Sequence, residues 1–213
     1  MRRAGEENVE SSRIILGLLD AVEQDRAQSQ RRLASELGIA LGLVNAYLKR
    51  CIKKGLVKVR EAPARRYAYY LTPQGFAEKS RLTVEYLSHS FGFFRQAKTD
   101  CSALFRLAKA RGVTTVVLVG QSDLAEIAAL CALEQGIKII GVVQEQPVND
   151  RFIGLPIYGK FEELPQQFDA VFVTNLAQAR ETCEAAVARF GLERVLIPDL
   201  LRVRMRQRGE ASA

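Results

Sequence analysis

The sequence predicts two domains, an α+β domain of helices and one β-hairpin followed by a small α/β domain with a doubly wound parallel sheet. In the first half, apolar residues recur at helical spacing between glycines, whereas the second half alternates β-branched apolar runs with helical segments. Residues 1–99 carry 18 basic and 10 acidic side chains, and residues 100–213 carry 13 and 14. This asymmetry indicates that the first domain alone faces a polyanion.

The first domain, residues 12–75, is expected to form three helices and a hairpin. The expected elements are a helix capped by Ser12, helices over 30–37 and 41–54, and strands over 56–60 and 67–71. Gly38 and Gly55 stand where the second and third helices should end. A helix, a tight turn, a second helix and a hairpin together predict a winged helix-turn-helix, whose second helix enters a DNA major groove.

Basic residues concentrate on this predicted winged helix-turn-helix. Eight basic residues and one acid lie between Lys49 and Arg66. Lysine and arginine neutralise phosphates, whereas base edges are contacted from the start of the recognition helix, where Asn45 can pair with adenine and Leu43 can touch a thymine methyl. The candidate DNA-binding residues are Ser29, Arg31, Leu43, Asn45, Lys49, Arg50, Lys53, Arg65 and Arg66.

Several motifs of the first domain resemble MarR-type winged-helix regulators. They are SQRRLASELGI (29–39), GLVN (42–45) and IKKGLV (52–57). YAYYLTPQG (67–75) and EKSRLT (78–83) resemble the branch of that family found with exopolysaccharide gene clusters. Ala40 departs from the family's usual capping Ser or Thr, and Leu43 from a common Lys. The resemblance implies a homodimer that regulates polysaccharide production.

Residues 76–111 are expected to form a helical linker and dimerisation region. Thr72 and Pro73 supply an N-cap and a first helical residue for a helix that runs toward Lys98, and a second capped helix is expected from Thr99 or Asp100 to Arg111. The first of these helices is more apolar than a lone surface helix requires. Its apolar residues are Phe76, Leu82, Val84, Leu87, Phe91, Phe93 and Phe94.

The second domain, residues 112–200, is expected to contain four parallel strands alternating with helices. The expected strands are 113–119, 137–143, 169–174 and 194–197, and the expected helices are 124–135 and 177–190. The turn after the first strand is where a dinucleotide fold binds pyrophosphate. It has Gly120, but Ser122 replaces the second glycine, and Gln144 stands where an acidic residue would hold a ribose.

The second domain also resembles the Rossmann-like N-terminal domains of sugar O-acyltransferases and related nucleotide-sugar modifying proteins. The likeness lies in VLVG (117–120), AEI (125–127), IGVV (140–143) and IGLPIYG (153–159). It implies a ligand pocket at the carboxyl ends of the strands. The candidate ligand-binding residues are Gly120, Gln121, Ser122, Asp123, Gln144, Thr174 and Asn175. A nucleotide or nucleotide sugar is the expected effector, and NAD fits the altered turn less well.

The leading interpretation is therefore a homodimeric regulator that binds double-stranded DNA, with a small-molecule effector at the α/β domain. One alternative is an NAD-dependent redox repressor resembling the Rex type, and another is a sugar-modifying enzyme with a winged-helix head. The single histidine and the four widely spaced cysteines predict no metal site and no catalytic residues. No apolar run reaches the roughly 18 residues of a membrane helix. We expect a cytoplasmic protein with flexible tails at 1–11 and 201–213.

Overall fold

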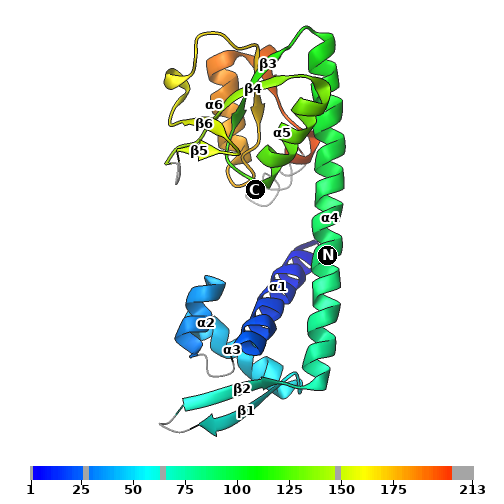
Figure 1. Ribbon diagram of the computed structural model, residues 1–213, viewed down its shortest axis with the longest axis vertical. Helices are drawn as coiled ribbons and strands as arrows, with labels where there is room; N and C mark the ends of the chain where they lie inside the picture. Colours follow the sequence, from blue (N-terminus) through cyan, green and yellow to red (C-terminus); the bar gives the residue numbers. More distant parts are fainter. Residues whose placement is uncertain (1, 26–28, 63–65, 147–149, 203–213) are drawn as a thin grey trace. The chain divides into compact units, whose positions relative to one another are not determined.

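The computed structural model describes residues 2–25, 29–62, 66–146 and 150–202. The chain divides into two compact units, Met1–Phe91 and Gly92–Ala213, and the division falls within one long helix. Figure 1 shows the elements of each unit. Each unit has its own hydrophobic core, as expected for two domains.

Unit 1 contains the expected three helices and hairpin. Its elements are α1 (Arg2–Gln24), α2 (Gln30–Leu37), α3 (Leu41–Lys53), β1 (Val57–Ala62), β2 (Arg66–Leu71) and the first part of α4 (Pro73–Ala110). The strands β1 and β2 are antiparallel. Gly38 ends α2 in the left-handed conformation at φ 62°, as its position in the sequence predicts.

Two helix boundaries differ from the prediction. Helix α1 begins at Arg2, so Ser12 lies inside it; no proline and one glycine precede Ser12, and nothing there breaks the helix. Helix α4 runs without interruption from Pro73 to Ala110, so a second helix does not begin at Thr99 or Asp100. The Thr99 hydroxyl donates to the Arg95 carbonyl within the helix, and Asp100 accepts from Gln96 one turn back, so neither residue acts as a cap.

Unit 2 is an α/β domain whose sheet has more strands than the sequence predicts. Its elements after α4 are β3 (Thr115–Val119), α5 (Asp123–Gln135), β4 (Lys138–Val143), β5 (Arg151–Phe152), β6 (Leu155–Tyr158), η1 (Phe161–Glu163), β7 (Ala170–Val173), α6 (Ala179–Phe190), η2 (Leu192–Arg194) and β8 (Val195–Leu196). The strand order is β5-β6-β4-β3-β7-β8, and only the β5–β6 pair is antiparallel. Both β5 and β6 were missed because they are short and Pro156 lies in β6.

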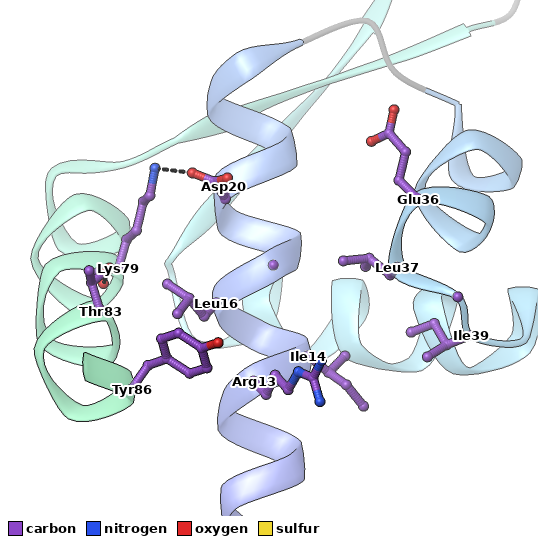
Figure 2. Close-up of a pocket in the computed structure, with 12 residues that line it drawn as sticks. Arg13, Ile14, Leu16, Asp20, Glu36, Leu37, Ile39, Lys79, Thr83 and Tyr86 are labelled. Carbon is purple, nitrogen blue, oxygen red and sulfur yellow. Dashed lines mark hydrogen bonds and ion pairs between the residues drawn. The ribbon is translucent and has the colours of Figure 1, made fainter. Parts of the chain in front are cut away.

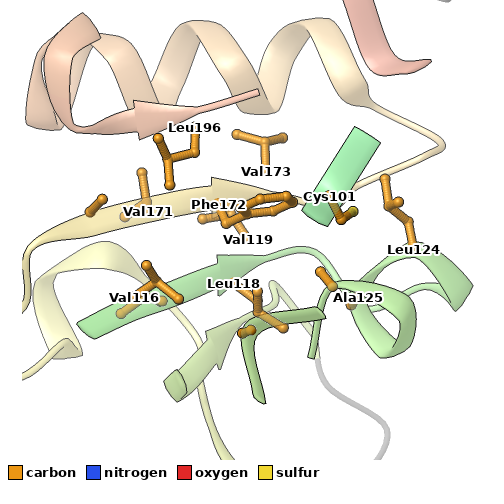
Figure 3. Packing of buried hydrophobic residues seen from close by; sticks show 14 of the residues in the cluster. Cys101, Val116, Leu118, Val119, Leu124, Ala125, Val171, Phe172, Val173 and Leu196 are labelled. Carbon is orange, nitrogen blue, oxygen red and sulfur yellow. The ribbon is translucent and has the colours of Figure 1, made fainter. Parts of the chain in front are cut away.

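The connections around β3 make the sheet doubly wound. The chain passes from β3 through α5 to β4 in one direction across the sheet, and from β7 through α6 to β8 in the opposite direction. Because such crossovers are right-handed, the two helices cover opposite faces. Figure 3 shows part of this core, with Phe172 of β7 among its buried side chains. The Phe172 ring stacks on the ring of Phe105 of α4, with ring centroids 4.4 Å apart. Leu201 is fully buried against this core, one residue beyond the expected end of the domain.

One carboxylate at the start of the sheet ties β3 to the segment before β7. Asp169 Oδ2 accepts hydrogen bonds from the backbone N–H groups of Thr114 at 2.7 Å and Thr115 at 2.8 Å, and from both threonine hydroxyls. The backbone N–H of Thr114 is the largest cause that lowers the Asp169 pKa to about 2. The ionised carboxylate therefore stabilises the folded state.

We expect Asp169→Ala to lower the free energy of unfolding by about 1 kcal/mol at pH 7, since the group is exposed and water competes for its bonds. A carboxyl with a lowered pKa contributes stability above its unfolded pKa and loses it as the pH falls to about 2. Urea unfolding of the wild type and of Asp169→Ala should therefore give a difference in the free energy of unfolding that shrinks from pH 5 to pH 2. A difference independent of pH would contradict this role. Asp199→Ala removes a carboxylate whose side chain is 81% exposed, and it serves as the control.

Candidate nucleic-acid interface

Helix α3 presents a basic face to solvent because its opposite face is anchored in the core. Val44, Leu48 and Cys51 are buried. On the other side Lys49 and Arg50 are exposed, together with Lys53, Leu43, Ala46 and Gly42. Asn45 is half-buried at the edge of this face. The structure therefore brings the candidates Leu43, Asn45, Lys49, Arg50 and Lys53 onto one helix, about 20 Å long for its 13 residues.

Helix α2 begins with the expected cap. Ser29 accepts a hydrogen bond at 3.3 Å from the Arg32 backbone N–H, so its side chain is engaged in capping. Arg32 pairs with Glu36 at 3.0 Å, whereas Arg31 is exposed. The Gln30 side-chain amide donates to the Tyr69 hydroxyl at 3.0 Å and so connects α2 to the hairpin. Sequence reasoning missed this bond, which joins residues 39 positions apart.

The hairpin adds further basic side chains. Lys58 and Arg60 on β1 are exposed, and the Arg60 guanidinium lies over the Tyr70 ring at 5.8 Å from its centroid. Of the two arginines predicted at the tip, Arg65 lies outside the described residues, and only the backbone of Arg66, at the start of β2, is described. Within the described part of the chain, no carboxylate lies within 4.0 Å of the basic side chains of α3 and β1. Their charge is thus available to a polyanion.

Thr72 connects α3, the hairpin and α4 at one point. Its hydroxyl donates to the Gly55 carbonyl at 2.6 Å and accepts from the Gly75 backbone N–H at 3.0 Å. Its own N–H donates to the Leu56 carbonyl at 3.1 Å. This confirms Thr72 as the N-cap of α4, and it fixes the end of α3 relative to the hairpin.

The candidate ligand residues of unit 2 lie together, and five of them hydrogen-bond to one another: Gly120, Gln121, Ser122, Gln144 and Thr174. The Gln121 backbone N–H donates to Gln144 Oε1 at 2.9 Å, and the Ser122 hydroxyl donates to the Thr174 carbonyl at 2.7 Å. The Thr174 hydroxyl donates to the Gly120 carbonyl at 2.6 Å. Asn175 Oδ1 accepts from the N–H groups of Ala177 at 3.0 Å and Gln178 at 2.9 Å. Asp123 is the exposed first residue of α5.

This turn does not fit a dinucleotide. A pyrophosphate would need the Gln121 N–H, which Gln144 already occupies, and a close approach at Gly120. The Gly120 position is taken up by Asn175, since a Cβ added to Gly120 would lie 2.6 Å from the Asn175 Cα. The glycine is thus required by packing within the chain. At the end of β4, where a dinucleotide-binding fold has an acidic residue, this chain has Gln144. Its side-chain oxygen accepts the Gln121 N–H of this turn.

Comparison with protein families finds a match within unit 1. Residues 11–58 match the family described as winged helix-turn-helix DNA-binding. This segment is a winged helix-turn-helix. A search of curated proteins finds no match. The matched segment covers the C-terminal part of α1, all of α2 and α3, and the first two residues of β1, and the exposed Lys49, Arg50, Lys53 and Lys58 lie within it.

Several solved structures are similar to parts of the chain. The PcaV transcriptional regulator from Streptomyces coelicolor, in complex with its natural ligand, is 19% identical over 44% of this chain and 74% of its own, with a TM-score of 0.38. Human N-acetylserotonin methyltransferase with SAM is 12% identical over 80% of this chain and 68% of its own, with a TM-score of 0.27. PigF with SAH is 15% identical over 81% and 65%, with a TM-score of 0.29. At these TM-scores, the family match is the comparison that bears on function.

A cavity of about 570 Å³ lies in unit 1 and is lined mostly by residues of the winged helix-turn-helix segment. It lies between α1, the turn after α2, and α4 (Figure 2). Lys79 of α4 pairs with Asp20 of α1 at 2.5 Å on its wall, and Arg13 and Tyr86 also line it. Sequence reasoning missed this cavity because its lining residues come from separate helices and share no motif.

The thiols of the chain are unsuited to nucleophilic chemistry. All four cysteines are free and buried. Burial raises the pKa of Cys51 to about 11 and that of Cys101 to about 12. Among the residues that the structure describes, no group of three or more His, Cys, Asp or Glu side chains could hold a metal ion. Within the same residues, none of the helices is both long and apolar enough to cross a membrane.

Proposed function

We propose that this protein is a homodimeric transcriptional regulator that binds double-stranded DNA through α3 and the hairpin. The observation that carries the proposal is the set of exposed basic side chains on α3 and β1, which have no carboxylate partner among the described residues and lie in or next to the segment that matches the winged helix-turn-helix family. Lys49, Arg50 and Lys53 suit phosphate contacts, and Asn45 suits a base edge. The resemblance of residues 67–75 and 78–83 supports genes of polysaccharide biosynthesis as targets, under the control of a small-molecule effector.

The test is binding to a labelled duplex from upstream of the gene, across a salt series. Lys49→Ala should weaken binding severalfold and lower the slope of log K against log salt by about one, because one phosphate contact is lost. Lys138→Ala, at an exposed lysine of unit 2, is the matched control and should leave both quantities unchanged. Equal salt slopes for both variants would refute the docking of α3 on DNA.

The dimer is proposed to form along α4. Val84, Leu87, Phe91 and Phe94 are exposed by 64%, 45%, 57% and 39%, and they follow one another at intervals of three, four and three residues. This is the spacing of the apolar seam between two packed helices. A second copy of the chain, with the same seam, would bury it in a two-fold interface.

Replacing Leu87 and Phe91 together by Glu should convert the dimer to a monomer, because charges in an apolar seam are desolvated without partners. Analytical ultracentrifugation of the full chain measures the change. Leu133→Glu, at a leucine of α5 that is 78% exposed, is the control and should leave a dimer. A wild-type chain that sediments as a monomer would exclude the proposed interface.

A further inference from the structure

The outward face of α3 has two chemically different halves. Its first two turns present Gly42, Leu43 and Ala46, and they contain no charged residue. The basic side chains begin only at Lys49 and continue to Lys53. Leu43 is 40% exposed and therefore offers its methyl groups to whatever α3 contacts.

Gly42 supports a close approach at this end of α3. Among the residues that the structure describes, nothing requires a glycine at this position, since a Cβ added to Gly42 meets no atom within 4 Å and its φ is not positive. Ala46, one turn later on the same outward face, is equally small. The small apolar residues at the start of α3 lie next to its basic residues. This arrangement fits a polyanionic partner that presents an apolar group close to the helix backbone.

From this exposed surface we infer that α3 recognises the C5-methyl groups of thymine. Leu43 is the specificity-determining residue, and the small residues Gly42 and Ala46 leave room for the methyl groups. The inference rests on the proposed function. The start of a recognition helix faces the base edges, and the thymine methyl is the apolar group that a base pair presents in the major groove. Asn45 remains the hydrogen-bonding side chain at the edge of this surface, and it suits the adenine of a neighbouring pair.

The experiment has two stages and uses the full chain. A pool of duplexes with a randomised centre is first selected for binding at fixed salt. The enriched duplex is then resynthesised with single thymines replaced by deoxyuridine, which lacks only the C5-methyl group. We expect one or two replacements to weaken wild-type binding about fourfold each, the ratio that burial of one methyl group supports.

Variants connect the effect to the side chain. Leu43→Ala should bind the thymine and deoxyuridine duplexes equally, whereas Leu130→Ala, at a 52% exposed leucine of α5, should keep the wild-type ratio. An enriched duplex that tolerates deoxyuridine at every position would overturn the inference and leave DNA binding intact. The same holds if Leu43→Ala retains the full sensitivity. A pool without enrichment would instead refute the proposed function itself.

Discussion

Gly120→Ala should lower the free energy of unfolding of the α/β domain by about 3 kcal/mol or more, from left-handed strain and overpacking together. Gly120 has a φ of 104°, which a side chain rarely adopts. The added Cβ would also lie 2.5 Å from the Cβ of Asn175 and 2.7 Å from its backbone nitrogen. Asn175 cannot retreat freely, because its N–H donates to the Val119 carbonyl at 3.0 Å.

Gly112→Ala separates the two contributions. Gly112 has a φ of 85°, and a Cβ there would meet nothing within 4 Å. This variant should therefore pay only the cost of the left-handed conformation, about 1–2 kcal/mol. Differential scanning calorimetry of both full-length variants measures the two losses. Equal losses would mean that the contact with Asn175 relaxes, and that Gly120 is free for another role such as ligand approach.

The same glycine illustrates what the sequence could and could not predict about unit 2. The β-branched runs around Val117 and Val142 predicted a parallel sheet, because only strands covered on both faces are apolar throughout. A glycine after the first strand also suggested a phosphate-binding turn. The local sequence pattern could not predict that Asn175, which follows a strand more than fifty residues later, packs against Gly120. The structure brings the residues predicted to bind a ligand close together, and Gly120, Gln121, Ser122, Gln144 and Thr174 hydrogen-bond among themselves.

In unit 1, prediction was more successful because its signals are local. Ser29 caps the start of α2, Gly38 ends α2 and Gly55 follows the end of α3, and the buried positions of α3 follow from helical spacing alone. Helix α3 itself begins after Ala40 without a side-chain cap. The continuity of α4 was missed for the opposite reason. Thr99 and Asp100 are good caps in isolation, and only packing decides that the helix continues: Cys101 and Phe105, which follow them, are fully buried in the core of unit 2.

Gly75→Ala should strongly destabilise unit 1, which contains the winged helix-turn-helix segment. A Cβ added to Gly75 would lie 2.1 Å from the Leu56 carbonyl oxygen and 2.7 Å from a methyl carbon of Leu71. The carbonyl is backbone that already accepts the Thr72 N–H, so it cannot move without opening the junction of α3, the hairpin and α4. We expect a loss of about 3–5 kcal/mol, comparable to the stability of a small domain.

Gly92→Ala is a control in the same helix with the opposite expected sign. A Cβ at Gly92 meets nothing within 4 Å, and alanine is preferred to glycine inside a helix by about 0.5–1 kcal/mol. The midpoint temperature of thermal unfolding, followed by circular dichroism, should therefore be lower for Gly75→Ala and slightly higher for Gly92→Ala than for the wild type. DNA binding should fail only in Gly75→Ala, because the Thr72 junction sets the position of the hairpin relative to α3. A Gly75→Ala protein with wild-type stability and DNA affinity would show that this junction adapts to a methyl group.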